Sequence, residues 1–279
     1  MNNAFYKISD INIEKVWGSM VINEKTIGEV IKFEVNSNRS NNIEDSQGNV
    51  YNLYELYDSP NRVLFFGVRY LNVDTFPFLV KYIYAKKRLS IQVHPEEKEE
   101  CWLFLKEGKV LLGLNSSISK NDIMVDKLLD KANILKVNKY GFAIVHPHTI
   151  HSIYEDNVIC EVQNNYDMTY RFYDWDNNRK LSKELFIEQA SFNKYDLQEN
   201  IIENFQSYHS SNYSIKKLSN IGNMNYKSND SFQLLIVLEG SGTIKSNADS
   251  MIIEKDTAYF IIPNTEFSIA GNVDFLLIC

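Results

Sequence analysis

The stretch Leu89-Ser90-Ile91-Gln92-Val93-His94-Pro95 decides how the first half of this chain folds. Successive side chains of a β-strand point to opposite faces, so Ser90, Gln92 and His94 share one face. The residues between them are apolar and share the other face. Because the apolar set seeks the interior while the polar set also needs partners, the pattern predicts a strand that packs on one side and lines a polar cavity on the other.

Four side chains in and near this strand form a candidate metal site. Glu100 follows the strand after a short turn, and His151 ends another β-like run. Together with Gln92 and His94, these residues offer nitrogen and oxygen ligands for a divalent metal. Imidazole combined with carboxylate suits zinc. A single histidine is more often a structural residue, so the inference depends on the combination.

Two further histidines compete with His151 for the role of ligand. His146 and His148 lie in the same short segment, so the sequence leaves the choice among the three open. His209 lies in a polar region and is expected to be exposed to solvent.

The composition is that of a soluble globular protein. The chain has 279 residues, of which 44% are hydrophobic and 23% are charged, and this length allows one large or two modest domains. A net charge of -7 argues against nucleic acid or an anionic membrane as the partner, but not against a small anionic substrate. The N-terminus carries no recognisable secretory signal, and no apolar run approaches the ~20 residues that span a bilayer. Cys101, Cys160 and Cys279 form no CxxC pair, which indicates reduced thiols in a cytoplasmic protein.

The pattern along the chain predicts a mainly β protein with a few short helices. Helical spacing of apolar residues predicts a helix near 118–132 and a short one at 181–190. From Phe232 to Ile278, short β-like runs recur at close spacing, which is typical of a sandwich or small barrel. We therefore expect two β domains, 1–190 with the candidate metal site and 191–279 without one.

Spaced motifs point to a known family. Ser-x-Gln-x-His-Pro is present at 90–95, Lys-x-Glu-x-Trp at 98–102, and a further strand and turn at 161–163 and 167–174. In these motifs the chain resembles the type I mannose-6-phosphate isomerases of the short bacterial form, which are metal-dependent cupins. The resemblance runs from about Trp17 to the C-terminus and is strongest in the two blocks 76–102 and 141–174. It implies two cupin-type β-barrel or jelly-roll domains, the second of them metal-free.

The resemblance also implies roles for individual residues. One zinc ion per chain would be held by Gln92, His94, Glu100 and His151. Lys98 and Arg171 would line the sugar site as catalytic residues, and Ser90 would help to hold the phosphate of the substrate. A positive Lys98 can stabilise a developing oxyanion or move a proton, whereas Arg171 can only stabilise charge. The alternatives are a surface lysine for Lys98 and a structural ion pair with Asp167 or Asp174 for Arg171.

Three departures from the family pattern bear on function. The helical segment that usually separates His-Pro from Lys-x-Glu is absent, so Pro95 and Lys98 are almost adjacent. The turn before the metal histidine has lost its glycine and has His148 instead. The family pattern has a basic residue six positions after the arginine that corresponds to Arg171. In this chain that position is occupied by Asn177.

The resulting hypothesis is a zinc-dependent aldose–ketose isomerase that interconverts mannose 6-phosphate and fructose 6-phosphate. The departures keep two alternatives open. One is a non-catalytic cupin that binds a sugar or sugar phosphate as a sensor or partner subunit. The other is an isomerase of a different phosphosugar. The sequence leaves the oligomeric state open.

Overall fold

The computed structural model describes residues 3–247 and 249–279, which fold into two compact units of mainly antiparallel β-structure. Unit 1 consists of residues 1–11, 31–79 and 206–279, and unit 2 consists of residues 12–30 and 80–205. The prediction of a mainly β chain is confirmed. The predicted boundary at residue 190 differs from this division, because the N-terminal strand pairs with a strand near the C-terminus, Phe5 opposite Ile261.

Unit 1 is built around one large sheet. Its strands follow the order β17 (Ser207–His209), β18 (Ser214–Asn220), β23 (Glu266–Ile278), β20 (Gln233–Lys245), β22 (Ala258–Ile261), β1 (Phe5–Ile8), β5 (Asn42–Glu44) and β6 (Val50–Asn52). β19 (Asn223–Lys227) pairs with β23, and β21 (Ser250–Glu254) pairs with β20. The helical elements of this unit are α1 (Leu53–Tyr57), α2 (Arg62–Phe66) and η1 (Val68–Tyr70). Stacked and edge-on aromatic rings, among them Phe33, Phe66 and Phe232, fill part of its core.

The runs predicted as separate strands after Phe232 are partly continuous. β20 and β23 each extend through a glycine where the sequence suggested a break. At Gly240 the backbone has a φ of +80°, and a Cβ atom there would lie 2.0 Å from the carbonyl oxygen of Asn272. The glycine therefore lets the strand pass close to its neighbour instead of ending it.

Unit 2 contains two facing sheets. One has the order β11 (Ala132–Val137), β10 (Gly108–Leu114), β13 (His151–Ile153), β8 (Ile91–Val93) and β15 (Tyr170–Tyr173). The other has the order β16 (Ile201–Ile202), β12 (Phe142–Val145), β9 (Glu100–Phe104), β14 (Asn157–Asn164), β7 (Phe78–Ala85), β4 (Lys25–Phe33) and β2 (Ile11–Glu14), with β3 (Met20–Ile22) paired to β4. The division between the units falls within β2, β4 and β7.

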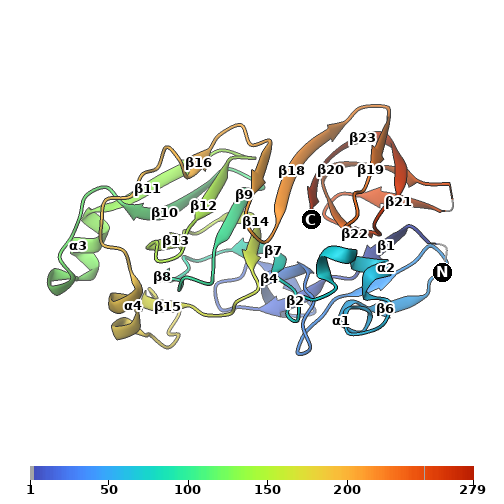
Figure 1. Cartoon of the computed structure of the whole chain (residues 1–279). Coiled ribbons are helices and arrows are strands. Elements are labelled where there is room, and N and C mark those ends of the chain that lie inside the picture. The colour runs from blue at the N-terminus through green and yellow to red at the C-terminus, as the bar shows by residue number, and fades with distance from the viewer. Residues whose placement is uncertain (1–2, 248) are drawn as a thin grey trace. The chain divides into compact units, whose positions relative to one another are not determined.

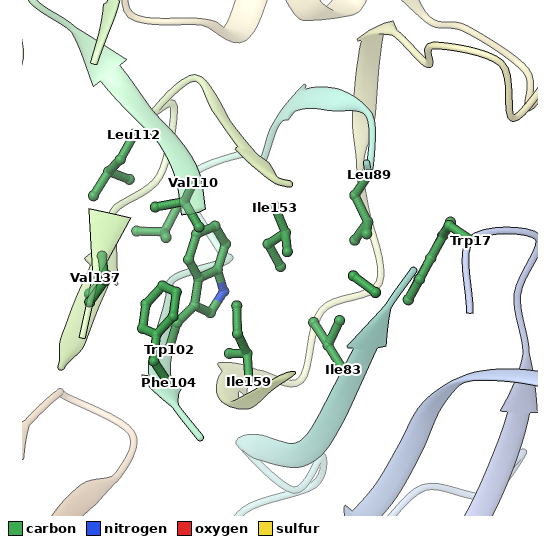
Figure 2. Packing of buried hydrophobic residues seen from close by; sticks show 13 residues of the cluster. Trp17, Ile83, Leu89, Trp102, Phe104, Val110, Leu112, Val137, Ile153 and Ile159 are labelled. Carbon is green, nitrogen blue, oxygen red and sulfur yellow. The ribbon is translucent and has the colours of Figure 1, made fainter. Parts of the chain in front are cut away.

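Apolar side chains from both sheets of unit 2 meet in one core. Figure 2 shows the indole of Trp102 among Val110, Ile153 and Ile159, which come from different strands of the two sheets. A second buried cluster lies on the other face of the first sheet, where Ile91 and Val93 pack with residues of α3 (Val125–Asp130) and α4 (Lys183–Gln189). Figure 1 shows α4 beside β15 and α3 near β11.

The predicted helix at 118–132 is shorter than expected. The segment forms the 3₁₀ turn η2 (Lys120–Asp122) and then α3, and Ala132 already begins β11. Pairing of Ala132 with Leu114 of β10 holds this residue in a strand, so tertiary hydrogen bonding overrides the local helical spacing. The helix predicted at 181–190 is confirmed as α4. Among the described residues, none of the helices has the length and apolar character needed to cross a bilayer.

Candidate metal centre

A row of polar side chains crosses the first sheet of unit 2. In the antiparallel register, Gln92 of β8 lies opposite His151 of β13 on one side and opposite Arg171 of β15 on the other. Residues directly opposite each other share a face of the sheet. His151 also pairs with Leu112, which belongs to the apolar core between the sheets. The polar row therefore faces the interior, as the alternation around Gln92 predicted.

Glu100 reaches the same interior from the second sheet. It is the first residue of β9, and the short turn 95–99 joins it to His94. Its Oε1 lies 2.9 Å from Nε2 of His94, and one ligand atom from each of His94, Glu100 and His151 lies within 4.8 Å of the others. All three side chains are buried, with exposed fractions of 1–2%. The structure thus brings together His94, Glu100 and His151, three of the four predicted ligands. The fourth, Gln92, contacts His151.

Backbone hydrogen bonds fix the tautomers of the two histidines. Nδ1 of His94 lies 2.8 Å from the carbonyl oxygen of Met168, and Nδ1 of His151 lies 2.8 Å from that of Thr149. A carbonyl oxygen only accepts, so each Nδ1 carries the proton and each Nε2 is left with a lone pair. Such bonds orient imidazoles that bind metals.

The two Nε2 atoms differ in their hydrogen-bond partners. Nε2 of His151 accepts from the amide nitrogen of Gln92 at 3.1 Å. Nε2 of His94 is buried and makes no hydrogen bond among the described residues, although the Glu100 carboxylate is close by. A buried lone pair beside an anion is costly unless a cation lies between them.

The ionisation states agree with a cation site. Burial lowers the pKa of His94 and lowers that of His151 to about 3, so both imidazoles are neutral. Burial alone would raise the pKa of Glu100, but positive charge beside the carboxylate, including that of Lys98, holds this pKa well below its usual range. Two neutral imidazoles and one carboxylate are the donor set that zinc prefers.

Lys98 lies inside the site. Its side chain is buried, and its Nζ lies 3.0 Å from Oε1 of Glu100. The alternative of a surface lysine is therefore wrong. Ser90 is also fully buried, and its hydroxyl donates to Oε1 of Gln92 at 2.8 Å.

Arg171 lies at the half-buried end of the polar row. Nε of Arg171 has no hydrogen-bond partner among the described residues. The carboxylate of Asp174, one of its two predicted partners, is bound instead by Arg179, with Nε 3.0 Å from Oδ2. The guanidinium therefore remains available on the same face as Gln92.

The competing histidines lie outside the buried cluster. Nδ1 of His146 contacts Oε2 of Glu99 at 3.1 Å, and Nε2 of His148 contacts Oε2 of Glu96 at 3.1 Å. Both side chains are partly exposed. The structure thus favours His151 over its two neighbours as a ligand.

Sequence reasoning missed a set of charged residues behind Glu100. The indole nitrogen of Trp102 donates to Oε2 of Glu161 at 3.0 Å and lies 3.3 Å from Oε2 of Glu100. Glu161 in turn contacts Nζ of Lys81 at 3.0 Å, and Lys81 lies 3.7 Å from Glu29. The sequence signal for this set was Lys81, which interrupts the apolar run of β7. A lysine is unusual in a strand that is buried on both faces.

The fold and the site together define a mainly β protein with a buried histidine–carboxylate centre suited to a metal ion. No model of a known protein family matches the chain. Among curated proteins, the chain is 26% identical over 275 aligned positions to the mannose-6-phosphate isomerase ManA of Bacillus subtilis, and the match covers 84% of this chain and 85% of that protein. The predicted resemblance to mannose-6-phosphate isomerases is confirmed.

Solved structures show the same fold. The mannose 6-phosphate isomerase from Bacillus subtilis matches with a TM-score of 0.83 at 19% identity, over 99% of both chains. A zinc-bound mannose 6-phosphate isomerase matches with a TM-score of 0.82 at 12% identity, again over 99% of both chains.

Proposed function

We propose that the chain is a zinc-dependent mannose-6-phosphate isomerase that interconverts mannose 6-phosphate and fructose 6-phosphate. The observation that carries this proposal is the buried group of His94, Glu100 and His151, with both imidazoles neutral and their Nε2 lone pairs turned inward. The likeness to isomerases of this kind supports it, including a zinc-bound one. A phosphosugar substrate and a cytoplasmic location are part of the same proposal.

The residues present fit one zinc ion per chain. His94, Glu100 and His151 would supply three ligands, and the amide oxygen of Gln92 would supply the fourth. The amide of Gln92 now turns its nitrogen toward His151 and its oxygen toward Ser90. Half a turn of the amide exchanges the two atoms, and the Ser90 hydroxyl can accept as well as donate. Bound zinc would supply charge stabilisation for the oxygens of the substrate.

The reaction requires a proton to move between two adjacent carbons beside a carbonyl. The barrier falls when the enediolate oxygen is stabilised and a positioned group transfers the proton. Lys98 is the group of this chain best placed for either task, because it is buried with its Nζ at the Glu100 carboxylate. Arg171 would stabilise negative charge from the open end of the polar row. Ser90 would help to hold the phosphate, as the resemblance implies.

A coupled assay of mannose 6-phosphate conversion tests the proposal. We expect His151→Ala, or treatment of the wild type with a chelator, to abolish conversion, and zinc to restore it only in the wild type. His209→Ala is the matched control, because His209 is exposed on β17 of unit 1 and should keep full activity. Full activity of His151→Ala, or of the chelated enzyme, would refute the role of the metal. Metal analysis of the purified protein then gives the zinc content per chain.

One observation favours a second candidate, a cupin that binds a sugar phosphate without turnover. Asn177 is buried, and its amide donates to the carbonyl oxygen of Arg88 at 2.8 Å. It therefore plays a structural part and adds no positive charge where the family has a basic residue. Tight binding of mannose 6-phosphate to the zinc-loaded protein without conversion would favour this candidate. A panel of other phosphosugars separates it from an isomerase of different specificity.

A further inference from the structure

Two of the connections that cross between the sheets of unit 2 end at proposed ligands. The turn 95–99 runs from β8 to β9, with His94 before it and Glu100 after it. The segment 146–150 runs from β12 to β13 and ends at His151. The distance between ligands on different sheets therefore depends on how these two connections are held.

The two connections are joined to each other at three points. The backbone N–H of His148 donates to the carbonyl oxygen of His94 at 2.9 Å. The side chain of His148 contacts Glu96 at 3.1 Å, and that of His146 contacts Glu99 at 3.1 Å. Each histidine thus reaches one glutamate of the turn that precedes Glu100.

The far side of the same turn is also held. The backbone N–H of Asn164 on β14 donates to the carbonyl oxygen of Glu99 at 3.0 Å, and its side-chain amide donates to that of Glu97 at 3.0 Å. The turn that carries Lys98 is therefore fixed from both flanks. The contacts on the flank of His146 and His148 include two pairs of ionisable side chains, whereas the two contacts with Asn164 are hydrogen bonds to backbone carbonyls.

His148 occupies a backbone conformation that does not favour it. Its φ is +64°, in the left-handed region where a side chain is strained and glycine is not. Non-glycine residues in such conformations cluster at functional sites, where the surrounding structure holds them in place. The imidazole supplies a contact that glycine would lack, the one with Glu96.

We propose that His146 and His148 are positioning residues, which tie the short turn 95–99 to the segment before His151 and so set the geometry of the metal ligands. This proposal rests on the proposed function only in requiring that zinc binds at His94, Glu100 and His151. The two pairs brace the short turn 95–99 from the side of the segment before His151. The histidines act on the ion through the connections and do not touch it.

Zinc and cobalt binding to the whole chain test the proposal without any measurement of activity. Metal-free wild type and the double variant His146→Ala with His148→Gly are titrated with zinc against a chromophoric chelator, and the absorption bands of bound cobalt report ligand geometry. We expect the zinc Kd of the double variant to weaken about tenfold, as is usual when groups behind metal ligands are lost, and the cobalt bands to shift. The glycine removes the strain at position 148, so a loss of folding is not expected to mask the effect.

Two further sets of variants make the result decisive. Glu97→Gln removes a carboxylate of the same turn that neither histidine contacts, and it should leave the zinc Kd and the cobalt bands unchanged. His146→Gln retains an N–H that can donate to Glu99 and should recover part of the affinity lost in His146→Ala. If the double variant fails to fold, Glu96→Ala with Glu99→Ala removes the same two pairs from the turn and must give the same weakening.

The outcomes separate this proposal from the proposed function. An unchanged zinc Kd and unchanged cobalt bands in the folded double variant overturn the positioning role, even if its thermal stability falls. If the wild type binds zinc but converts no mannose 6-phosphate, the proposed function fails. Weakened zinc binding in the variants would still uphold the positioning role.

Discussion

Replacement of Lys81 by methionine tests the charged set behind Glu100. Nζ of Lys81 lies 3.0 Å from Oε1 of Glu161, whose side chain is 3% exposed. At an effective dielectric constant of about 20, charges this far apart attract each other by about 5.5 kcal/mol. Methionine matches the aliphatic part of lysine and lacks its ammonium group, so the variant tests mainly the charge.

We expect Lys81→Met to lower the free energy of unfolding of the metal-free protein by about 3–5 kcal/mol, the usual loss when one partner of a buried ion pair is removed. The cause is Glu161, which would remain buried beside Glu100 without the Lys81 cation and would have to take up a proton. Burial and the Glu100 charge already raise the pKa of Glu161, so loss of the lysine favours its protonated form still further. Adding Glu161→Gln removes this carboxyl and retains an acceptor for Trp102, so the double variant should recover at least half of the loss.

Urea unfolding of chelator-treated protein, followed by circular dichroism, measures these differences. Wild type, both single variants and the double variant form a thermodynamic cycle. Lys86→Met is the control, because Lys86 pairs with Asp156 at the surface of the same unit, with both side chains about two-thirds exposed. Its loss should stay within about 1 kcal/mol. Additive losses in the double variant of the cycle would show that Lys81 and Glu161 do not act as a pair.

Three further predictions concern the metal and its surroundings. Trp102→Phe removes the N–H shared by Glu100 and Glu161 and should weaken the zinc Kd by tenfold or more in a competition titration; an unchanged Kd contradicts the role given to the indole. Zinc at one hundred times its Kd should raise the free energy of unfolding by about 2.7 kcal/mol in urea titrations, and a chelator should remove this gain; no dependence on zinc would exclude binding to the folded state. Hydrogen bonding to Glu99 raises the pKa of His146, so this pair stabilises the fold fully below pH about 6.5, and its contribution is lost as the pH rises through the raised pKa. NMR titration of His146 should show that raised pKa in the wild type and an ordinary one in Glu99→Gln, and equal values would refute the pairing.

The interior face of the site could be predicted because it depends on local alternation. Ser90, Gln92 and His94 share a face in any strand, and the apolar residues between them fix which side meets the outer cluster. The closeness of Glu100 to His94 could also be predicted, because only the short turn 95–99 separates the two residues in the sequence. The family resemblance implied that Lys98 lies in the site, but local patterns did not, because a lysine in a run of glutamates is equally typical of a solvated turn.

Other features depend on contacts between residues far apart in the sequence. The helix at 118–132 was predicted too long, because nothing local shows that Ala132 pairs with Leu114. The role of Lys81 depends on Glu161, which lies on the neighbouring strand β14 and 80 positions further along the chain. The pairing of β1 with β22 is equally invisible to local patterns.

The interleaving of the chain has a consequence for its synthesis on the ribosome. β1 ends at Ile8, whereas its partner β22 begins at Ala258 and is made much later. At about 5–20 residues per second, the two strands emerge on the order of 10–50 seconds apart. During this interval the edge of β1 that later pairs with β22 lacks this partner. Nascent chains are therefore most exposed to aggregation before unit 1 closes, and a chaperone that covers the N-terminal strand would act in that window.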